Sequence, residues 1–109
     1  MIPLPDVLRR IGGLEEAELV AWIERRWVRP ERAAEGYLFR DVDLARVQLI
    51  VEIRRECAVD DEALELVLSL LDQIYRLRRQ LKALSGAIVS QPTEVQERIL
   101  AVLSEREPG

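Results

Sequence analysis

Hydrophobic residues recur every three or four positions along most of the chain, and this spacing predicts five helices. We expect them over residues 4–11, 15–26, 42–57, 61–84 and 92–106. Residues 28–40 break the helical spacing: Pro30 and Gly36 bracket this segment, and the run Tyr37-Leu38-Phe39 is typical of a strand. The pattern therefore predicts a mainly helical fold with one short hairpin, or wing, between the second and third helices.

Several residues mark where these helices begin and end. Asp41 and Asp60 are placed to cap the third and fourth helices, and Ser85-Gly86 predicts the end of the fourth. Pro92 lies at or near the expected first position of the last helix. We expect that last helix to bury an apolar stripe formed by Val95, Ile99, Val102 and Leu103.

The fourth helix carries the most regular apolar spacing. Its hydrophobic positions alternate by four and three residues, the a/d pattern of a coiled coil: Ala63, Val67, Leu70, Ile74, Leu77, Leu81, Leu84 and Ile88. The first half, as far as Leu71, is apolar nearly all round, so we expect it to pack against the first three helices. The narrower stripe of the second half predicts a coiled-coil-like dimer seam at Ile74, Leu77, Leu81 and Leu84. Alternatively, residues 92–106 fold back and cover this seam within one chain.

The composition argues against catalysis. The chain has no histidine and one cysteine, so it lacks the usual general base near neutral pH, the histidine-dependent nucleophile systems and the ligands of a zinc cluster. None of its glycines lies in a phosphate-binding loop motif. We therefore expect no enzyme activity, no cofactor and no metal.

Cys57 is expected to be a small buried residue, and Trp22 and Trp27 are expected to belong to the core.

The length of 109 residues fits a single domain over residues 1–109. Its expected parts are a first region (1–58), the long helix (59–86) and a C-terminal helical extension (87–109). The formal net charge is −4, and no apolar run reaches the roughly 20 residues that a membrane span needs. The first residues lack the basic and apolar segments of a signal peptide. We therefore expect a cytoplasmic protein.

Two short helices joined by Gly12-Gly13, then a wing and a third helix, resemble the winged helix–turn–helix of MerR-type proteins. In that family the second helix enters the DNA major groove and the wing grips phosphate. Here the second helix opens with Glu15, Glu16 and Glu18, which would repel phosphate. We interpret the arginines around the wing as a solvated rim, with contacts to DNA or to a protein partner as alternatives: Arg25, Arg26, Arg29, Arg32 and Arg40. DNA binding is thus disfavoured, and a DNA-binding regulator stays the alternative function.

A longer run is similar to the chaperone-modulator (CbpM-like) family, small bacterial relatives of the MerR architecture. The similarity covers roughly residues 10–85. Its main segments are Tyr37-Leu38-Phe39, Val47-Gln48, Arg54-Arg55-Glu56, Ala58-Val59-Asp60, Leu68-Ser69-Leu70-Leu71-Asp72-Gln73-Ile74 and Leu77. The opening strand that is usual in this family is not evident in residues 2–6.

This resemblance implies that the protein binds the J-domain of a DnaJ-like (CbpA-type) co-chaperone and blocks its cooperation with DnaK. A J-domain presents a basic helix to DnaK, so an inhibitor that covers this surface needs carboxylates. The resemblance places partner-binding residues at Arg54, Glu56, Asp60 and Asp72. Each has a plainer alternative: Asp60 caps a helix, Arg54 and Asp72 pair with each other, and Glu56 is solvated.

Overall fold

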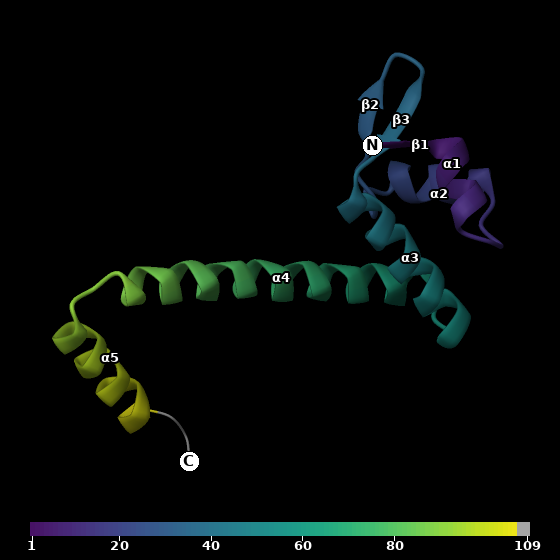
Figure 1. Ribbon diagram of the computed structural model, residues 1–109. Coiled ribbons are helices and arrows are strands. Elements are labelled where there is room, and N and C mark those ends of the chain that lie inside the picture. Colours follow the sequence, from purple (N-terminus) through teal and green to yellow (C-terminus); the bar gives the residue numbers. More distant parts are fainter. Residues whose placement is uncertain (107–109) are drawn as a thin grey trace. The chain divides into compact units, whose positions relative to one another are not determined.

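The computed structural model describes residues 1–106 and divides into two compact units, Met1–Leu68 and Ser69–Gly109 (Figure 1). The boundary between the units falls inside the long helix α4, Asp61–Val89. Each unit is described by itself. The single-domain organisation over residues 1–109 stays a prediction.

The first unit is a small mixed structure that confirms the predicted helices and wing. The predicted cap of the third helix is wrong, because Asp41 is the first residue of that helix and Arg40 is its N-cap. In chain order it contains β1 (Ile2–Pro3), α1 (Leu4–Arg10), α2 (Glu16–Glu24), β2 (Glu31–Ala33), β3 (Gly36–Phe39), α3 (Asp41–Glu56) and the first turns of α4. The hairpin of β2 and β3 extends away from the helices of this unit (Figure 1). Gly36 has φ +131°, a conformation that favours glycine, and it opens the second strand of the hairpin.

The opening strand β1 is present, although residues 2–6 show no strand pattern. Ile2 pairs with Phe39 and Pro3 with Leu38, so the antiparallel sheet has the order β1-β3-β2. A strand of two residues is too short to show an alternating pattern. The expectation that residues 2–6 contain no strand is therefore wrong.

The core of the first unit draws on every helix in it. Phe39 from β3 and Leu19 from α2 are fully buried, and Val47 and Ile50 face them from α3. The remaining buried hydrophobic residues are Leu4, Val7, Ile11, Leu14, Trp22, Trp27, Val28, Val51, Leu64 and Leu68. The core placement of Trp22 and Trp27 is confirmed.

The N-terminal half of α4 contributes only one of its faces to this core. Leu64 and Leu68 are buried, whereas Leu66 is 61% exposed and Leu70 49% exposed. The backbone N–H of Ala63 donates to the Asp60 carboxylate at 2.8 Å, so the predicted cap is confirmed. The expected packing of this half against the first three helices is confirmed for one face, and the apolar residues on its other faces stay exposed.

The predicted end of α4 at Ser85-Gly86 is also wrong, because the helix continues to Val89. Gly86 has open space where a Cβ would lie, and it is tolerated inside the helix at a cost of about 1 kcal/mol relative to alanine. The amide of Gln96 caps the true end by donating to the carbonyl oxygens of Val89 at 3.1 Å and Gln91 at 2.7 Å. A long-range cap of this kind leaves no local sequence signal.

The last helix, α5 (Thr93–Arg106), starts next to Pro92 as predicted, but its apolar stripe is not buried. Val95 and Ile99 are partly covered, whereas Val102 and Leu103 are about half exposed. The expected burial of Cys57 is wrong as well, since this residue follows α3 in an exposed turn. In both cases helical spacing or residue type predicts burial, but no segment within residues 1–106 covers these side chains.

Candidate binding surfaces

The helix–turn–helix consists of α1, the turn at Gly12-Gly13 and α2. The exposed side chains at the start of α2 are acidic, and the backbone N–H of Glu15 donates to the Glu18 carboxylate at 3.3 Å. These carboxylates favour the positive end of the helix dipole but repel a phosphate that approaches the same end. The part of α2 that a DNA-binding protein would point at nucleic acid is thus locally negative.

The turn before α2 is held by a contact that the sequence did not suggest. Arg55, near the end of α3, donates from its guanidinium to the carbonyl oxygen of Gly12. Gly13 has φ +80°, and a Cβ there would lie 2.8 Å from the Arg55 side chain. Gly13 therefore suits the backbone conformation of the turn, and a side chain there would also displace the end of the Arg55 side chain.

Three of the five arginines around the wing already have partners within the first unit. Arg25 pairs with Asp61 at 3.2 Å, and Arg40 with Asp43 at 3.0 Å. Arg32 donates to the Tyr37 hydroxyl at 3.3 Å. Hydrogen bonding to the Asp43 carboxylate raises the pKa of Arg40 above its ordinary value.

The other two, Arg26 and Arg29, are exposed, and no side-chain hydrogen bond or ion pair holds them within residues 1–106. Arg26 has φ +63°, which places it at the turn where α2 ends. Arg25 and Arg40 keep about half of their side chains exposed, so all five arginines lie at the solvent surface, and these two also pair with carboxylates.

A family model described as MerR HTH family regulatory protein matches residues 6–86 of this chain. The chain belongs to the MerR HTH regulatory family. Comparisons with curated proteins and with solved structures found no match. The MerR-type match spans the helix–turn–helix, the wing, α3 and most of α4, and it leaves out α5. The predicted MerR-like winged helix–turn–helix followed by a long helix is therefore confirmed.

The structure brings three of the four predicted partner-binding residues of this MerR-family protein to one region. Arg54 and Glu56 lie at the end of α3, and Asp60 precedes α4. Asp72 lies in the second unit. Glu56 is exposed and Asp60 caps α4, whereas Arg54 is engaged with Asp61. The sequence did not indicate Asp61 as the partner of Arg54, because helical spacing does not report contacts across a turn.

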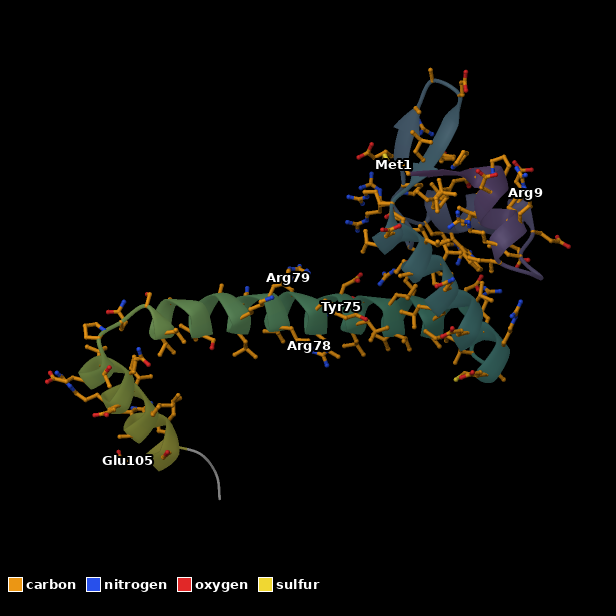
Figure 2. All side chains as sticks on the ribbon, viewed as in Figure 1. Met1, Arg9, Tyr75, Arg78, Arg79 and Glu105 are labelled. Carbon is orange, nitrogen blue, oxygen red and sulfur yellow. The ribbon has the colours of Figure 1, made fainter. Side chains whose placement is uncertain are left out.

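The predicted dimer seam is open to solvent along its whole length. Ile74 is 44% exposed, Leu77 57%, Leu81 64% and Leu84 58%. Side chains project freely from this part of α4, with Arg78 and Arg79 on opposite sides of the helix (Figure 2). Dimerisation itself stays a prediction.

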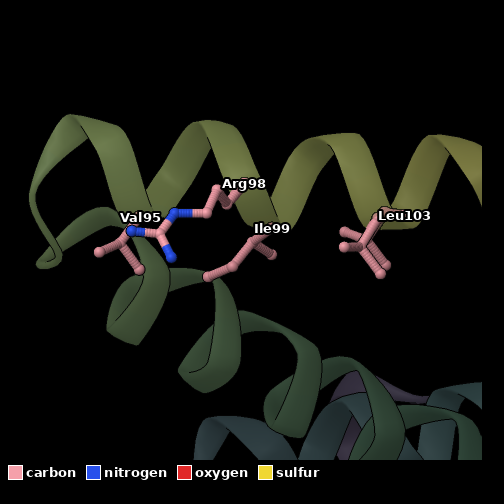
Figure 3. Close-up of a pocket in the computed structure, with 5 residues that line it drawn as sticks. Val95, Arg98, Ile99 and Leu103 are labelled. Carbon is pink, nitrogen blue, oxygen red and sulfur yellow. The ribbon is translucent and has the colours of Figure 1, made fainter.

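A second apolar surface lies on α5, where Val95, Ile99, Val102 and Leu103 line a shallow hollow beside Arg98. These side chains share one face of the helix (Figure 3). The alternative that α5 covers the seam of α4 within one chain does not agree with the exposures of Leu77, Leu81 and Leu84. Both apolar faces are therefore available to a partner.

The structure offers little for metal or membrane chemistry. Within residues 1–106, no three or more His, Cys, Asp or Glu side chains are grouped so that they could hold a metal ion. No helix in the same range is both long and apolar enough to cross a bilayer. What the described surfaces offer is charge and apolar area, the means by which one macromolecule binds another.

Proposed function

We propose that this MerR-family protein is a chaperone modulator: it binds the J-domain of a DnaJ-like (CbpA-type) co-chaperone and inhibits its cooperation with DnaK by covering its surface. The observation that carries the proposal is the exposed acidic segment at the junction of α3 and α4. Its carboxylates belong to Glu52, Glu56, Asp60, Glu62 and Glu65. The resemblance to chaperone modulators is carried partly by the same segment.

The charge of this junction suits a basic partner. A J-domain presents a basic helix to DnaK, and opposite patches steer such surfaces together and raise the association rate. The acidic start of α2 and the engagement of Arg25 and Arg40 lower the positive charge of the helix–turn–helix. These features support a protein partner over DNA.

Occlusion requires no chemistry, and the proposal therefore includes no enzyme activity and no cofactor. We further propose that the protein acts as a dimer through Ile74, Leu77, Leu81 and Leu84. The support is the a/d spacing together with the exposure of these residues. Contiguous apolar surface of this extent is rarely left in water by a soluble monomer.

The test is an assay of DnaK ATPase stimulation by the J-domain protein of the same organism. Addition of this protein in excess should suppress the stimulation. The charge-reversed variant Glu52→Lys with Glu56→Lys should suppress it much less, because two carboxylates of the junction become cations. A matched variant on α5, Glu94→Lys with Glu97→Lys, makes the same charge change at exposed positions and should inhibit like the unmodified protein. Undiminished stimulation with excess unmodified protein would show that the proposal is wrong.

A DNA-binding regulator is the second candidate, and membership of a family of HTH regulatory proteins supports it. The exposed, unpaired side chains of Arg26 and Arg29 are the groups that would contact phosphate. If the protein regulates transcription, it should retard operator DNA at moderate salt, and Arg26→Gln with Arg29→Gln should abolish the shift while the fold is kept. Absence of any shift down to low salt would exclude this candidate.

A further inference from the structure

Two arginines from different helices converge on one carboxylate in the first unit. Arg25, at the end of α2, donates from its guanidinium to one Asp61 oxygen at 3.2 Å. Arg54, on α3, donates to the other oxygen of the same carboxylate. Asp61 is the first residue of α4 and keeps 45% of its side chain exposed. This arrangement is a two-arginine anion site that opens to solvent.

Each of the two guanidinium groups is also supported by an aromatic ring. The Arg25 guanidinium lies 5.3 Å from the centroid of Trp27, and that of Arg54 lies 5.8 Å from the centroid of Trp22. Both distances are within the range of cation–π attraction. Trp22 and Trp27 are themselves fixed in the core. The two arginines are therefore held in place by more than the carboxylate between them.

Guanidinium groups bind phosphate and carboxylate oxygens with the same planar hydrogen-bonding geometry. Arg25 and Arg54, which both donate to the Asp61 carboxylate, would therefore also bind a phosphate. Arg25 lies at the end of the second helix of the helix–turn–helix, the helix that such motifs direct at DNA. The exposed Arg26 and Arg29 follow it directly. DNA backbone phosphate is thus the external anion that this site fits best.

We propose that Asp61 is an internal anion which occupies this two-arginine phosphate site and so keeps Arg25 and Arg54 from the DNA backbone. The carboxylate belongs to the same chain, so its effective concentration at the site is high, and a phosphate competes with it at a disadvantage. Neutralisation of Asp61 should uncover two additional phosphate contacts. This proposal does not depend on J-domain binding, and it stands or falls separately.

The test uses the full chain with Asp61→Asn, and fluorescence anisotropy of a labelled random-sequence DNA duplex of about 20 base pairs, two helical turns. Each additional phosphate contact steepens the plot of log affinity against log salt by about 0.9. Two contacts should therefore make the loss of affinity between about 50 and 200 mM salt roughly tenfold larger than in the unmodified protein. The gain should disappear when Arg25→Gln and Arg54→Gln are both added to Asp61→Asn.

The matched control is Glu62→Gln, which removes one negative charge from the next residue of the same helix turn. Glu62 is exposed, and its carboxylate forms no ion pair with the described arginines. If Glu62→Gln strengthened DNA binding as much as Asp61→Asn, net charge alone would explain the gain and the proposal would be overturned. The proposal would also be overturned if Asp61→Asn gave no gain, or if the gain survived the combined replacement Arg25→Gln with Arg54→Gln.

Folding is checked by circular dichroism and thermal unfolding of each variant. Asp61→Ser provides a second neutral replacement that suits the first turn of a helix, and Asp60 still supplies the cap. Both variants should keep the helical spectrum and bind DNA alike. If both unfolded the protein, Asp61 would be a structural residue and the assignment as an internal anion would be wrong.

Discussion

Replacement of Leu77 and Leu81 by aspartate tests the proposed seam on α4. Both leucines lie at seam positions and are 57% and 64% exposed in the single chain. Full burial of a leucine contributes about 1.5–3 kcal/mol, so completing the burial of each of these would contribute about 1–2 kcal/mol. With two leucines in each of two chains, the double variant removes about 4–8 kcal/mol of apolar stabilisation.

A loss of 4 kcal/mol already weakens a dimer about a thousandfold, before the cost of burying carboxylates is counted. Leu77→Asp with Leu81→Asp should therefore be a folded monomer. Sedimentation equilibrium over a concentration range from about 1 μM to several hundred μM measures this directly. Circular dichroism confirms that the helices are retained.

The control variant is Ala83→Asp with Gly86→Asp, which adds the same two charges to α4 away from the seam. Ala83 is exposed, and Gly86 has open space for a side chain. This variant should dimerise like the unmodified protein. The reasoning is refuted if the unmodified protein is monomeric at high micromolar concentration, or if the control dissociates as fully as the seam variant.

Further predictions concern the first unit, and chemical denaturation of each variant measures the free energy of unfolding. Leu68→Ala should cost about 2–5 kcal/mol because Leu68 is buried, whereas Leu66→Ala, two residues along the same helix, should cost less than about 0.5 kcal/mol; equal costs would contradict the orientation of α4. Asp43→Ala should cost about 1–2 kcal/mol, because the buried Asp43 carboxylate accepts the Arg40 backbone N–H at 2.9 Å; an unchanged midpoint would show that this cap is dispensable. Gly13→Ala should lower the thermal midpoint through its positive φ and its contact with the Arg55 side chain, and an unaltered midpoint would contradict that geometry.

The helices of the first unit were predictable because their apolar residues recur at helical spacing and the core covers them. Leu19 on α2 and Ile50 on α3 illustrate this, since both are fully buried in the core. The wing was predictable from Pro30 and Gly36, which interrupt the helical pattern. Together these elements were enough to indicate the MerR-type architecture.

Other features depend on contacts between distant residues and leave no periodic signal. The two-residue strand β1 exists only because β3 pairs with it. The end of α4 is set by Gln96, which lies beyond the helix. The stripe on α5 showed that helical spacing predicts an apolar face but not whether the chain itself covers it.

The candidate site was predictable only in outline. The sequence indicated Arg54, Glu56 and Asp60 as a region, and the structure places them together around the junction of α3 and α4. The sequence did not indicate that Asp61 pairs with both Arg25 and Arg54, because these two arginines are far apart in the chain. Ion pairs between exposed charges depend on tertiary placement, which one sequence does not specify.

If the proposed function is correct, this protein and DnaK cover the same surface of a J-domain. The most direct test is a competition measurement in which a fluorescently labelled J-domain is first bound to ATP-loaded DnaK and then titrated with this protein. We expect this protein to displace DnaK from the J-domain as it binds, without forming a ternary complex. The variant Glu52→Lys with Glu56→Lys should displace DnaK poorly. Failure to bind the J-domain, or a stable ternary complex of all three proteins, would contradict the account.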